Sequence, residues 1–241
     1  MISAAQNVIE SLHQANRRRL ARRRGKRLEH LYKLDVQSRF EFIFSSNYWG
    51  NGESRSGNGS TLESTQQLRP ALEALLQEMN VRTFLDAPCG DWNWMQSVKL
   101  PQDMLYIGGD IVQSMIDGLK ERHSSEYVAF KHMNIIEAPL PRCDLWMCRD
   151  SLFHLSAADI VKTLQNFLRS GTPYVLLTNM SNIRVNEDIM TGSYRPLNLL
   201  LKPFSLPKPR RTLPDSPVHE KQRYMGLWHR EDLVSLFPSD H

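Results

Sequence analysis

Apolar positions along the middle of the chain recur with two periods, one typical of helices and one typical of buried strands. Leu68, Leu72, Leu75 and Leu76 have helical spacing, whereas short apolar runs separate the helical segments. The predicted helices are 62–79, 93–98, 112–123 and 157–170, and the predicted strands are 81–85, 104–108, 127–132, 145–148 and 174–178. Because this alternation is typical of βαβ units, we predict an α/β fold with a mostly parallel central sheet and helices on both faces.

The pattern changes on both sides of this α/β region. Residues 195–215 contain five prolines, so regular structure is not expected there, and residues 224–228 are predicted to return as an edge strand. Residues 1–35 have a partial leucine stripe and predict a helical extension. We therefore divide the chain into this extension (1–35), a Gly- and Ser-rich capping segment (36–65) and an α/β domain (66–241).

Composition is that of an ordinary soluble globular protein, with 41% hydrophobic and 23% charged residues among 241. No apolar run approaches the roughly 20 residues needed to cross a bilayer, and the first residues lack a secretory-signal pattern. The three cysteines, Cys89, Cys143 and Cys148, have no metal-like spacing. They predict reduced thiols and a cytoplasmic protein.

The net charge of +4 comes from one short segment. Residues 17–27 contain seven Arg and one Lys, and removing these eight charges turns the formal net charge from +4 to −4. Such a segment can be a solvated helix, an organellar presequence, or a contact for RNA, an acidic partner or an anionic membrane surface. No aromatic residue interrupts the run, which disfavours a base-stacking nucleic-acid site.

The end of the first predicted strand carries the strongest chemical signal. The turn there consists of Asp86, Ala87, Pro88, Cys89, Gly90, Asp91 and Trp92. It places backbone N–H groups and a carboxylate at the carboxyl edge of the sheet, where open α/β sheets bind ligands. Asp110, at the end of the second strand, is placed to accept both hydroxyls of a ribose. Because Gly90 is the only glycine of the turn, a ligand with ribose but no phosphates is favoured, and S-adenosylmethionine is such a ligand.

The turn and Asp110 resemble the cofactor site of class I S-adenosylmethionine-dependent methyltransferases, over residues 66–230. The resemblance implies a Rossmann-like fold. It also implies that Asn134 lies near the adenine and that residues 143–155, which include the fourth strand, form motif IV and the start of the helix after it.

Five motifs are more specific than the turn alone. Residues 47–50 read Asn-Tyr-Trp-Gly, and the other four motifs lie at 54–61, 86–95, 148–155 and 191–199. Together they resemble a bacterial family of class I methyltransferases associated with surface-polysaccharide gene clusters. The resemblance implies O-methylation of a small or glycan-linked acceptor, at a sugar hydroxyl or a phosphate-type group. The chain departs from the family pattern at Arg55, at Asn134 (where Asp is usual) and in its basic N-terminus.

We expect catalysis to depend on His154 as a general base and on Asp150 to orient it. The alternatives are that His154 only packs against the cofactor pocket, and that Asp150 faces the sulfonium or holds a metal together with a second oxygen ligand. The expected cofactor contacts are the turn 86–92, Asp110, Ile111, Asn134, Arg149, Tyr48, Trp49 and Thr61, and the expected substrate contacts are Arg55, Ser56 and Arg195.

Several of these roles have competing interpretations. Arg149 and Arg195 could instead hold an anionic acceptor or form structural ion pairs. Tyr48 and Trp49 could cover the cofactor, stack on a sugar or anchor the N-terminal segment. No metal site is expected from the sequence, which has no convincing cluster of metal ligands.

Two other functions are consistent with the same cofactor signature. The first is a nucleic-acid methyltransferase tethered by residues 17–27, which predicts salt-sensitive binding lost on deleting residues 1–30. The sequence lacks the Asn-Pro-Pro-Tyr or Pro-Cys signature that such enzymes carry beside the fourth strand. The second is a cofactor-binding module without catalysis. The sequence does not indicate an oligomeric state.

Overall fold

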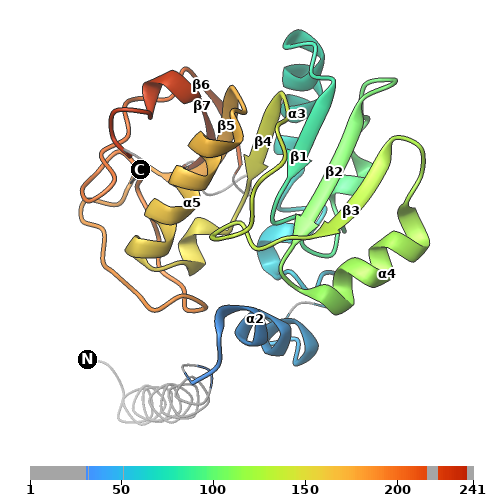
Figure 1. Ribbon diagram of the computed structural model, residues 1–241, viewed down its shortest axis with the longest axis horizontal. Helices are drawn as coiled ribbons and strands as arrows, with labels where there is room; N and C mark the ends of the chain where they lie inside the picture. Colours follow the sequence, from blue (N-terminus) through green and yellow to red (C-terminus); the bar gives the residue numbers. More distant parts are fainter. Residues whose placement is uncertain (1–30, 32, 51, 216–221, 238–241) are drawn as a thin grey trace, which may run out of the picture.

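The computed structural model describes residues 31, 33–50, 52–215 and 222–237, which form one central sheet with helices on both faces (Figure 1). The strand order is β3-β2-β1-β4-β5-β7-β6. The strands are β1 (Thr83–Asp86), β2 (Leu105–Asp110), β3 (Val128–His132), β4 (Leu145–Cys148), β5 (Tyr174–Met180), β6 (Arg211–Pro214) and β7 (Arg223–His229). The helices are α2 (Val36–Ser45), α3 (Leu68–Glu78), α4 (Gln113–His123) and α5 (Ala157–Ser170). The predicted α/β fold is confirmed.

The sheet is parallel from β3 to β5 and antiparallel at β7, which pairs with both β5 and β6. Two predictions about its C-terminal part were wrong. Strand β7 is not an edge strand, because it lies between β5 and β6. Residues 195–215 do contain regular structure, because β6 pairs with β7. Pro214 ends β6 on the outer edge of the sheet, where a residue without an N–H group is tolerated.

The helices form largely where the periodicity predicts them. Helix α5 has the predicted bounds: the Ser156 hydroxyl accepts the Asp159 N–H at its start, and Gly171 ends it in the left-handed conformation (φ +72°). Helix α3 begins at Leu68, six residues later than predicted. The prediction of a helix at 93–98 was wrong, because only a 3-10 turn forms there (Met95–Ser97). A stretch this short makes too few hydrogen bonds to sustain an α-helix.

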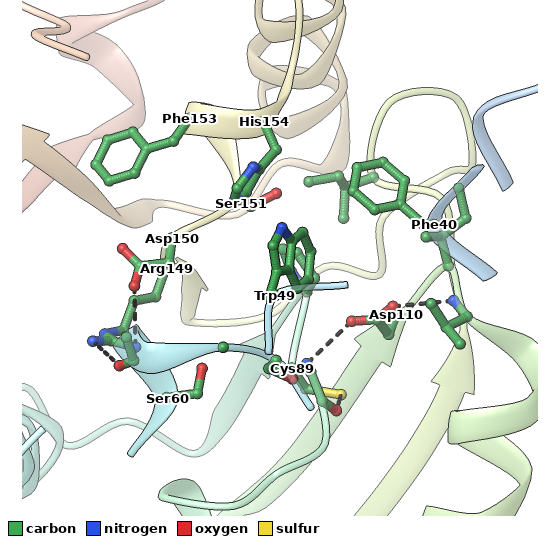
Figure 2. A pocket seen from close by; sticks show the side chains of 18 of the residues that line it. Phe40, Trp49, Ser60, Cys89, Asp110, Arg149, Asp150, Ser151, Phe153 and His154 are labelled. Atoms are coloured by element: carbon green, nitrogen blue, oxygen red, sulfur yellow. Dashed lines mark hydrogen bonds and ion pairs between the residues drawn. The ribbon is translucent and has the colours of Figure 1, made fainter. Parts of the chain in front are cut away.

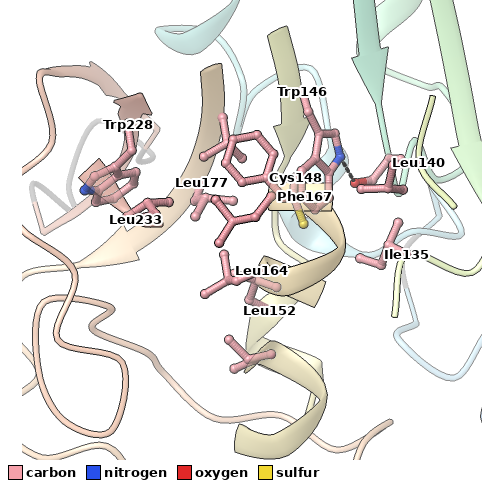
Figure 3. Packing of buried hydrophobic residues seen from close by; sticks show 14 of the residues in the cluster. Ile135, Leu140, Trp146, Cys148, Leu152, Leu164, Phe167, Leu177, Trp228 and Leu233 are labelled. Atoms are coloured by element: carbon pink, nitrogen blue, oxygen red, sulfur yellow. Dashed lines mark hydrogen bonds between the residues drawn. The ribbon is translucent and has the colours of Figure 1, made fainter. Parts of the chain in front are cut away.

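The core lies on both faces of the sheet, and strand β4 shows the division. Leu145 and Met147 pack on the face covered by α3 and α4, whereas Trp146 and Cys148 pack on the opposite face, against α5 (Figure 3). All four side chains are at most 1% exposed. The indole N–H of Trp146 donates to the Ala87 carbonyl at 2.8 Å, so the core also fixes the turn that follows β1.

Helix α2 lies beyond the sheet edge at which the parallel strands end (Figure 1). The Asp35 carboxylate accepts the Ser38 N–H and begins the helix. The predicted helical extension 1–35, with its basic run 17–27, lies outside the described residues apart from Leu31 and residues 33–35. Within the described part of the chain, no helix is long and apolar enough to cross a membrane.

Candidate functional site

The turn after β1 is held by Asp110, the last residue of β2. The Asp110 carboxylate accepts the Gly90 N–H at 3.1 Å with one oxygen and the Val112 N–H at 3.0 Å with the other. Gly90 is in the left-handed conformation (φ +57°), and a Cβ there would collide with the Ser56 hydroxyl. The backbone conformation and the contact with Ser56 therefore favour glycine at this position.

Two buried carboxyl groups lie at this edge of the sheet. Burial raises the pKa of Asp110 to about 6, although the N–H groups of Val112 and Gly90 oppose the shift. Burial also raises the pKa of Asp86 to about 7, against the hydrogen bond from the Tyr106 hydroxyl (2.7 Å) and the charge of Arg149. Both carboxyl groups thus change protonation close to neutral pH.

A cavity of about 450 Å³ opens beside the turn, between the strand ends and the capping segment (Figure 2). This volume is within the range of small-molecule sites. Its wall on the sheet side consists of Asp86, Pro88, Cys89, Gly90, Asp110, Ile111, Val112, Met133, Asn134, Ile135 and Ile136. The remaining lining comes from α2 and the loop after it (Val36, Phe40, Phe44, Trp49, Ser56, Gly57, Asn58, Gly59 and Ser60), and from Trp94, Met115, Arg149, Asp150, Ser151, Phe153, His154, Leu155, Met180, Tyr194 and Arg223.

The loop of residues 54–60, the capping loop, is bonded to both sides of this cavity. On one side the Asp91 carboxylate accepts the Ser54 hydroxyl (2.9 Å) and the Arg55 N–H (2.8 Å). On the other side the Arg149 guanidinium donates to the Gly59 carbonyl at 2.8 Å. A Cβ at Gly59 would collide with the Asp150 carboxylate, so the loop approaches the end of β4 closely. The capping loop therefore encloses the cavity.

Four charged side chains form an ion-pair network beside the capping loop. Arg149 pairs with Asp215 at 2.8 Å. Arg223 pairs with Asp215 at 3.1 Å and with Asp150 at 2.9 Å. Asp150 has φ +52°, and burial opposes its charge, but Arg149 and Arg223 outweigh burial and hold its pKa below the usual value. The network thus keeps Asp150 ionised at the cavity wall.

His154 lies across the cavity from the turn, in a defined tautomer. Its Nδ1 is 2.8 Å from the Ser193 carbonyl oxygen, which can only accept, so Nδ1 carries the proton. The neutral ring therefore presents Nε2 as an acceptor. Burial lowers the pKa of His154, more than the Ser193 carbonyl and Asp150 raise it, so the ring is neutral at pH 7. The ring packs against Trp49 at 4.9 Å and Tyr194 at 5.7 Å between centroids.

Most of the residues predicted from the sequence lie together at this cavity. The predicted residues that line it are Asp86, Pro88, Cys89, Gly90, Asp110, Ile111, Asn134, Arg149, Asp150, His154, Trp49 and Ser56. The side-chain oxygen Oδ1 of Asn134 accepts the Ile136 N–H at 3.0 Å, which leaves the side-chain nitrogen Nδ2 to donate to a ligand. Burial raises the pKa of the Cys89 thiol well above its usual value. This side chain therefore lines the cavity as an uncharged thiol and does not act as a nucleophile.

The other predicted residues are not part of the cavity lining. Asp91 holds the capping loop from outside. Trp92 packs on Phe130 (5.3 Å between centroids) and on Tyr106 (5.9 Å). The Ala87 carbonyl accepts from Trp146, as described above. The Thr61 hydroxyl bonds to Ser64 at 2.9 Å, inside the segment that leads to α3. Tyr48 also lies outside the lining.

Two predicted substrate contacts have other partners in the structure. The Arg55 guanidinium lies over the Phe44 ring at 5.4 Å, in a separate surface hollow with Arg122. The Arg195 guanidinium is buried and donates to the main-chain carbonyls of Glu187 (2.8 Å) and Leu152 (3.0 Å). These contacts favour a structural role for Arg195.

The sequence reasoning missed several lining residues. Arg223 and Tyr194 are the most important, because both are polar. Tyr194 lies within the 191–199 motif but was not assigned a role, and Arg223 comes from a segment without a recognised motif. Arg223 begins β7, one residue before the strand predicted at 224–228, but no sequence pattern shows which side chains it meets. In the described residues, no group of three or more His, Cys, Asp or Glu side chains could hold a metal ion.

Comparison with solved structures identifies the fold family of the chain, whereas comparison of sequences finds no match. No family model matches the chain, and no curated protein matches it. Among solved structures, magnesium protoporphyrin IX methyltransferase (ChlM) from Synechocystis PCC 6803 with bound SAM superposes with a TM-score of 0.55 at 14% identity, over 82% of this chain and 98% of that one. The same protein with bound SAH gives 0.52 at 11% identity, over 81% and 100%. The chain has the Rossmann-like class I methyltransferase fold.

Proposed function

We propose that this protein is an S-adenosylmethionine-dependent methyltransferase that methylates an oxygen of a small or glycan-linked acceptor. One observation carries the proposal: a buried acidic residue, Asp110, lines an enclosed cavity at the carboxyl edge of the sheet and holds the one-glycine turn beside it. The fold supports the same function. The glycan-linked acceptor, and a relation to the family associated with surface-polysaccharide genes, rest on the sequence motifs.

The lining residues fit S-adenosylmethionine in their chemistry. A carboxylate offers about four acceptor positions, and the protein uses two at Asp110, so the ribose hydroxyls can take the others. Ile111, Met133 and Ile135 supply an apolar surface for the adenine, with the Asn134 amide beside them. A dinucleotide fits less well, because its pyrophosphate would lie among the carboxylates of this wall.

S-adenosylmethionine, held by Asp110 and the turn after β1, would supply an electrophilic methyl group to the acceptor oxygen. The protein positions the acceptor and excludes water, and the capping loop with Trp49 performs the second task. His154 Nε2 takes the proton from an acceptor hydroxyl. Asp150 stabilises the resulting imidazolium by its charge.

Isothermal titration calorimetry with S-adenosylmethionine, S-adenosylhomocysteine and NAD tests the cofactor. We expect the first two to bind and NAD not to bind. Losing two charge-assisted hydrogen bonds in Asp110→Ala should weaken binding by at least about 100-fold. Asp117→Ala, which changes an exposed aspartate of α4, is the matched control and should bind like the wild type. Tight NAD binding without a response to the other two ligands would overturn the proposal.

A further inference from the structure

The two guanidinium groups of the cavity are already engaged by carboxylates. Arg149 pairs with Asp215 and also donates to the Gly59 carbonyl, and its guanidinium lies over the Trp94 ring at 5.1 Å. Arg223 bridges Asp150 and Asp215. Recognition of a phosphate or carboxylate by arginine needs a fork of donors that is not committed elsewhere. Neither guanidinium group is therefore available to bind a phosphate-type acceptor.

The charge around the cavity also disfavours an anion. Among the described lining residues, Asp86, Asp110 and Asp150 are acidic, Arg149 and Arg223 are basic, and none is a lysine. Asp215 adds one more negative charge directly behind the two arginines. Because charges in a partly enclosed site are only weakly screened, a phosphate group would be repelled there.

The groups that remain at the acceptor end accept hydrogen bonds. His154 presents Nε2, because its Nδ1–H is committed to the Ser193 carbonyl. Asp150 lies four residues earlier, on the same wall (Figure 2), and its Oδ1 has no hydrogen-bond partner among the residues that the structure describes. A buried carboxylate oxygen without a donor is costly, so an occupant that donates to Asp150 is favoured. Two acceptors on one wall call for a ligand with two neighbouring donors.

Aromatic rings complete this end of the cavity. Trp49 and Tyr194 both contact the His154 ring, at 4.9 Å and 5.7 Å between centroids, and Tyr194 is 60% exposed. Phe153 contacts Tyr194 edge-on at 6.2 Å between centroids. Such rings give a rigid apolar surface for the C–H face of a saturated ring, and the exposed Tyr194 marks the side open to solvent.

We infer that the acceptor is an uncharged polyhydroxyl ring whose two adjacent hydroxyls donate to His154 Nε2 and to the Asp150 carboxylate. This inference rests on the proposed function and decides between its two acceptor types in favour of the hydroxyl. The hydroxyl facing His154 is methylated: its oxygen forms the O–CH₃ bond and its proton passes to Nε2, then to solvent. The neighbouring hydroxyl keeps its proton and orients the ring. Arg223 and Asp215 are positioning residues, because Arg223 pairs with Asp150 and Asp215 pairs with Arg223.

Binding of simple sugars to the full-length protein saturated with S-adenosylhomocysteine tests the inference. The probes are methyl glycosides of glucose, galactose, mannose and rhamnose, the 1- and 6-phosphates of the first three sugars, and inorganic phosphate. Titrations followed by NMR should show at least one glycoside binding at least about tenfold more tightly than every phosphate. Tighter binding of any phosphate, or no glycoside binding, would overturn the inference.

A double-mutant comparison then tests the role of Asp150. The glycoside that binds best is compared with its two analogues that each lack one of the paired hydroxyls, in the wild type and in Asp150→Ala. One analogue should bind at least about tenfold more weakly than its parent in the wild type and equally well in the variant. An unchanged preference in the variant contradicts the assignment. Calorimetry with S-adenosylhomocysteine keeps the two proposals apart: its failure to bind refutes the proposed function, whereas binding with a preference for phosphates refutes only this inference. If Asp150→Ala does not fold, the wild-type panel decides alone.

Discussion

Asp86 and Asp110 are adjacent carboxyl groups with different surroundings, and the difference assigns them different tasks. Asp110 receives two main-chain N–H groups and lines the cavity with acceptor positions to spare. Asp86 is 2% exposed and receives the Tyr106 hydroxyl, so it fixes the end of β1 beside β2. Its charge is opposed by burial and has no compensating main-chain donor in the described structure. Ionisation of Asp86 at rising pH is therefore expected to destabilise the fold.

Asp86→Asn should remove a pH dependence of stability. The pKa of Asp86 is raised from 3.8 to about 7, so between these values the folded state binds more protons than the unfolded state and stability falls as pH rises. This group alone should lower the free energy of unfolding by up to about 1.4 kcal/mol per pH unit in that window. Urea unfolding from pH 4 to pH 8 should show the variant gaining relative to the wild type up to pH 7. A constant difference between the two proteins would contradict the shift.

His154→Gln should separate proton transfer from binding. Loss of a general base lowers kcat by about 10²–10⁴-fold, whereas calorimetry should give an unchanged affinity for S-adenosylhomocysteine. In the wild type, burial keeps the pKa of His154 below 6.5, so activity should fall as pH drops below that value and the ring becomes protonated. The acidic fall should be absent from the residual activity of the variant. His123→Gln, at the end of α4 outside the cavity, is the control.

At the scale of elements, the capping loop joins two parts of the sheet that are distant in sequence. It contacts the turn after β1 through Asp91 and the end of β4 through Arg149 and Asp150. The Gly- and Ser-rich composition of residues 36–65 predicted a capping segment. Its contacts could not be predicted, because they depend on where β4 lies relative to β1 in space.

Gly59→Ala should displace the capping loop, whereas Gly52→Ala should not. A Cβ at Gly59 collides with the Asp150 carboxylate, but a Cβ at Gly52 meets no atom within 4 Å. Overpacking of this kind costs about 1–3 kcal/mol, so Gly59→Ala should weaken S-adenosylhomocysteine binding by roughly 10–100-fold. Calorimetry on both variants checks the difference. Equal affinities would show that the loop does not enclose the ligand.

The elements that the sequence predicted best are those with a strong local pattern. Strand β4 is four apolar residues in a row, and α5 has a cap at each end and a continuous apolar face, so both have the predicted bounds. Strand β6 was missed because four residues among prolines have no local preference for a strand. It exists because β7 pairs with it, which is a tertiary effect.

At the scale of the whole molecule, the site is assembled from three distant regions of the chain. Arg149 and Asp150 follow β4, whereas Asp215 follows β6 and Arg223 begins β7. Asp110 could be predicted because it lies at the end of the second strand, at a characteristic distance in sequence from the turn after the first strand. Arg223 and Asp215 could not, because their partners at the end of β4, Asp150 and Arg149, are more than 60 residues away and only the strand order brings them together.

Ligand binding should stabilise the whole domain, because both sheet halves contribute to the cavity. At a concentration 100 times its Kd, S-adenosylhomocysteine adds about 2.7 kcal/mol to the free energy of unfolding. For a chain of this size that corresponds to a rise in Tm of about 5–10 °C. Thermal unfolding with and without ligand measures the rise. Asp110→Ala should show a rise of at most about 1–2 °C at the same ligand concentration, and a rise equal to the wild type would contradict the role of Asp110.

The hydrogen bonds that join the capping loop to both sides of the cavity have a consequence for the order of events in turnover. Ligand exchange requires the contacts of Asp91 and of Arg149 to the loop to break, while methyl transfer requires them to be made. Release of the spent cofactor, and not the chemical step, is therefore expected to limit the steady-state rate. Rapid-quench measurements should show a burst of product in the first turnover, followed by a slower phase that depends on solvent viscosity.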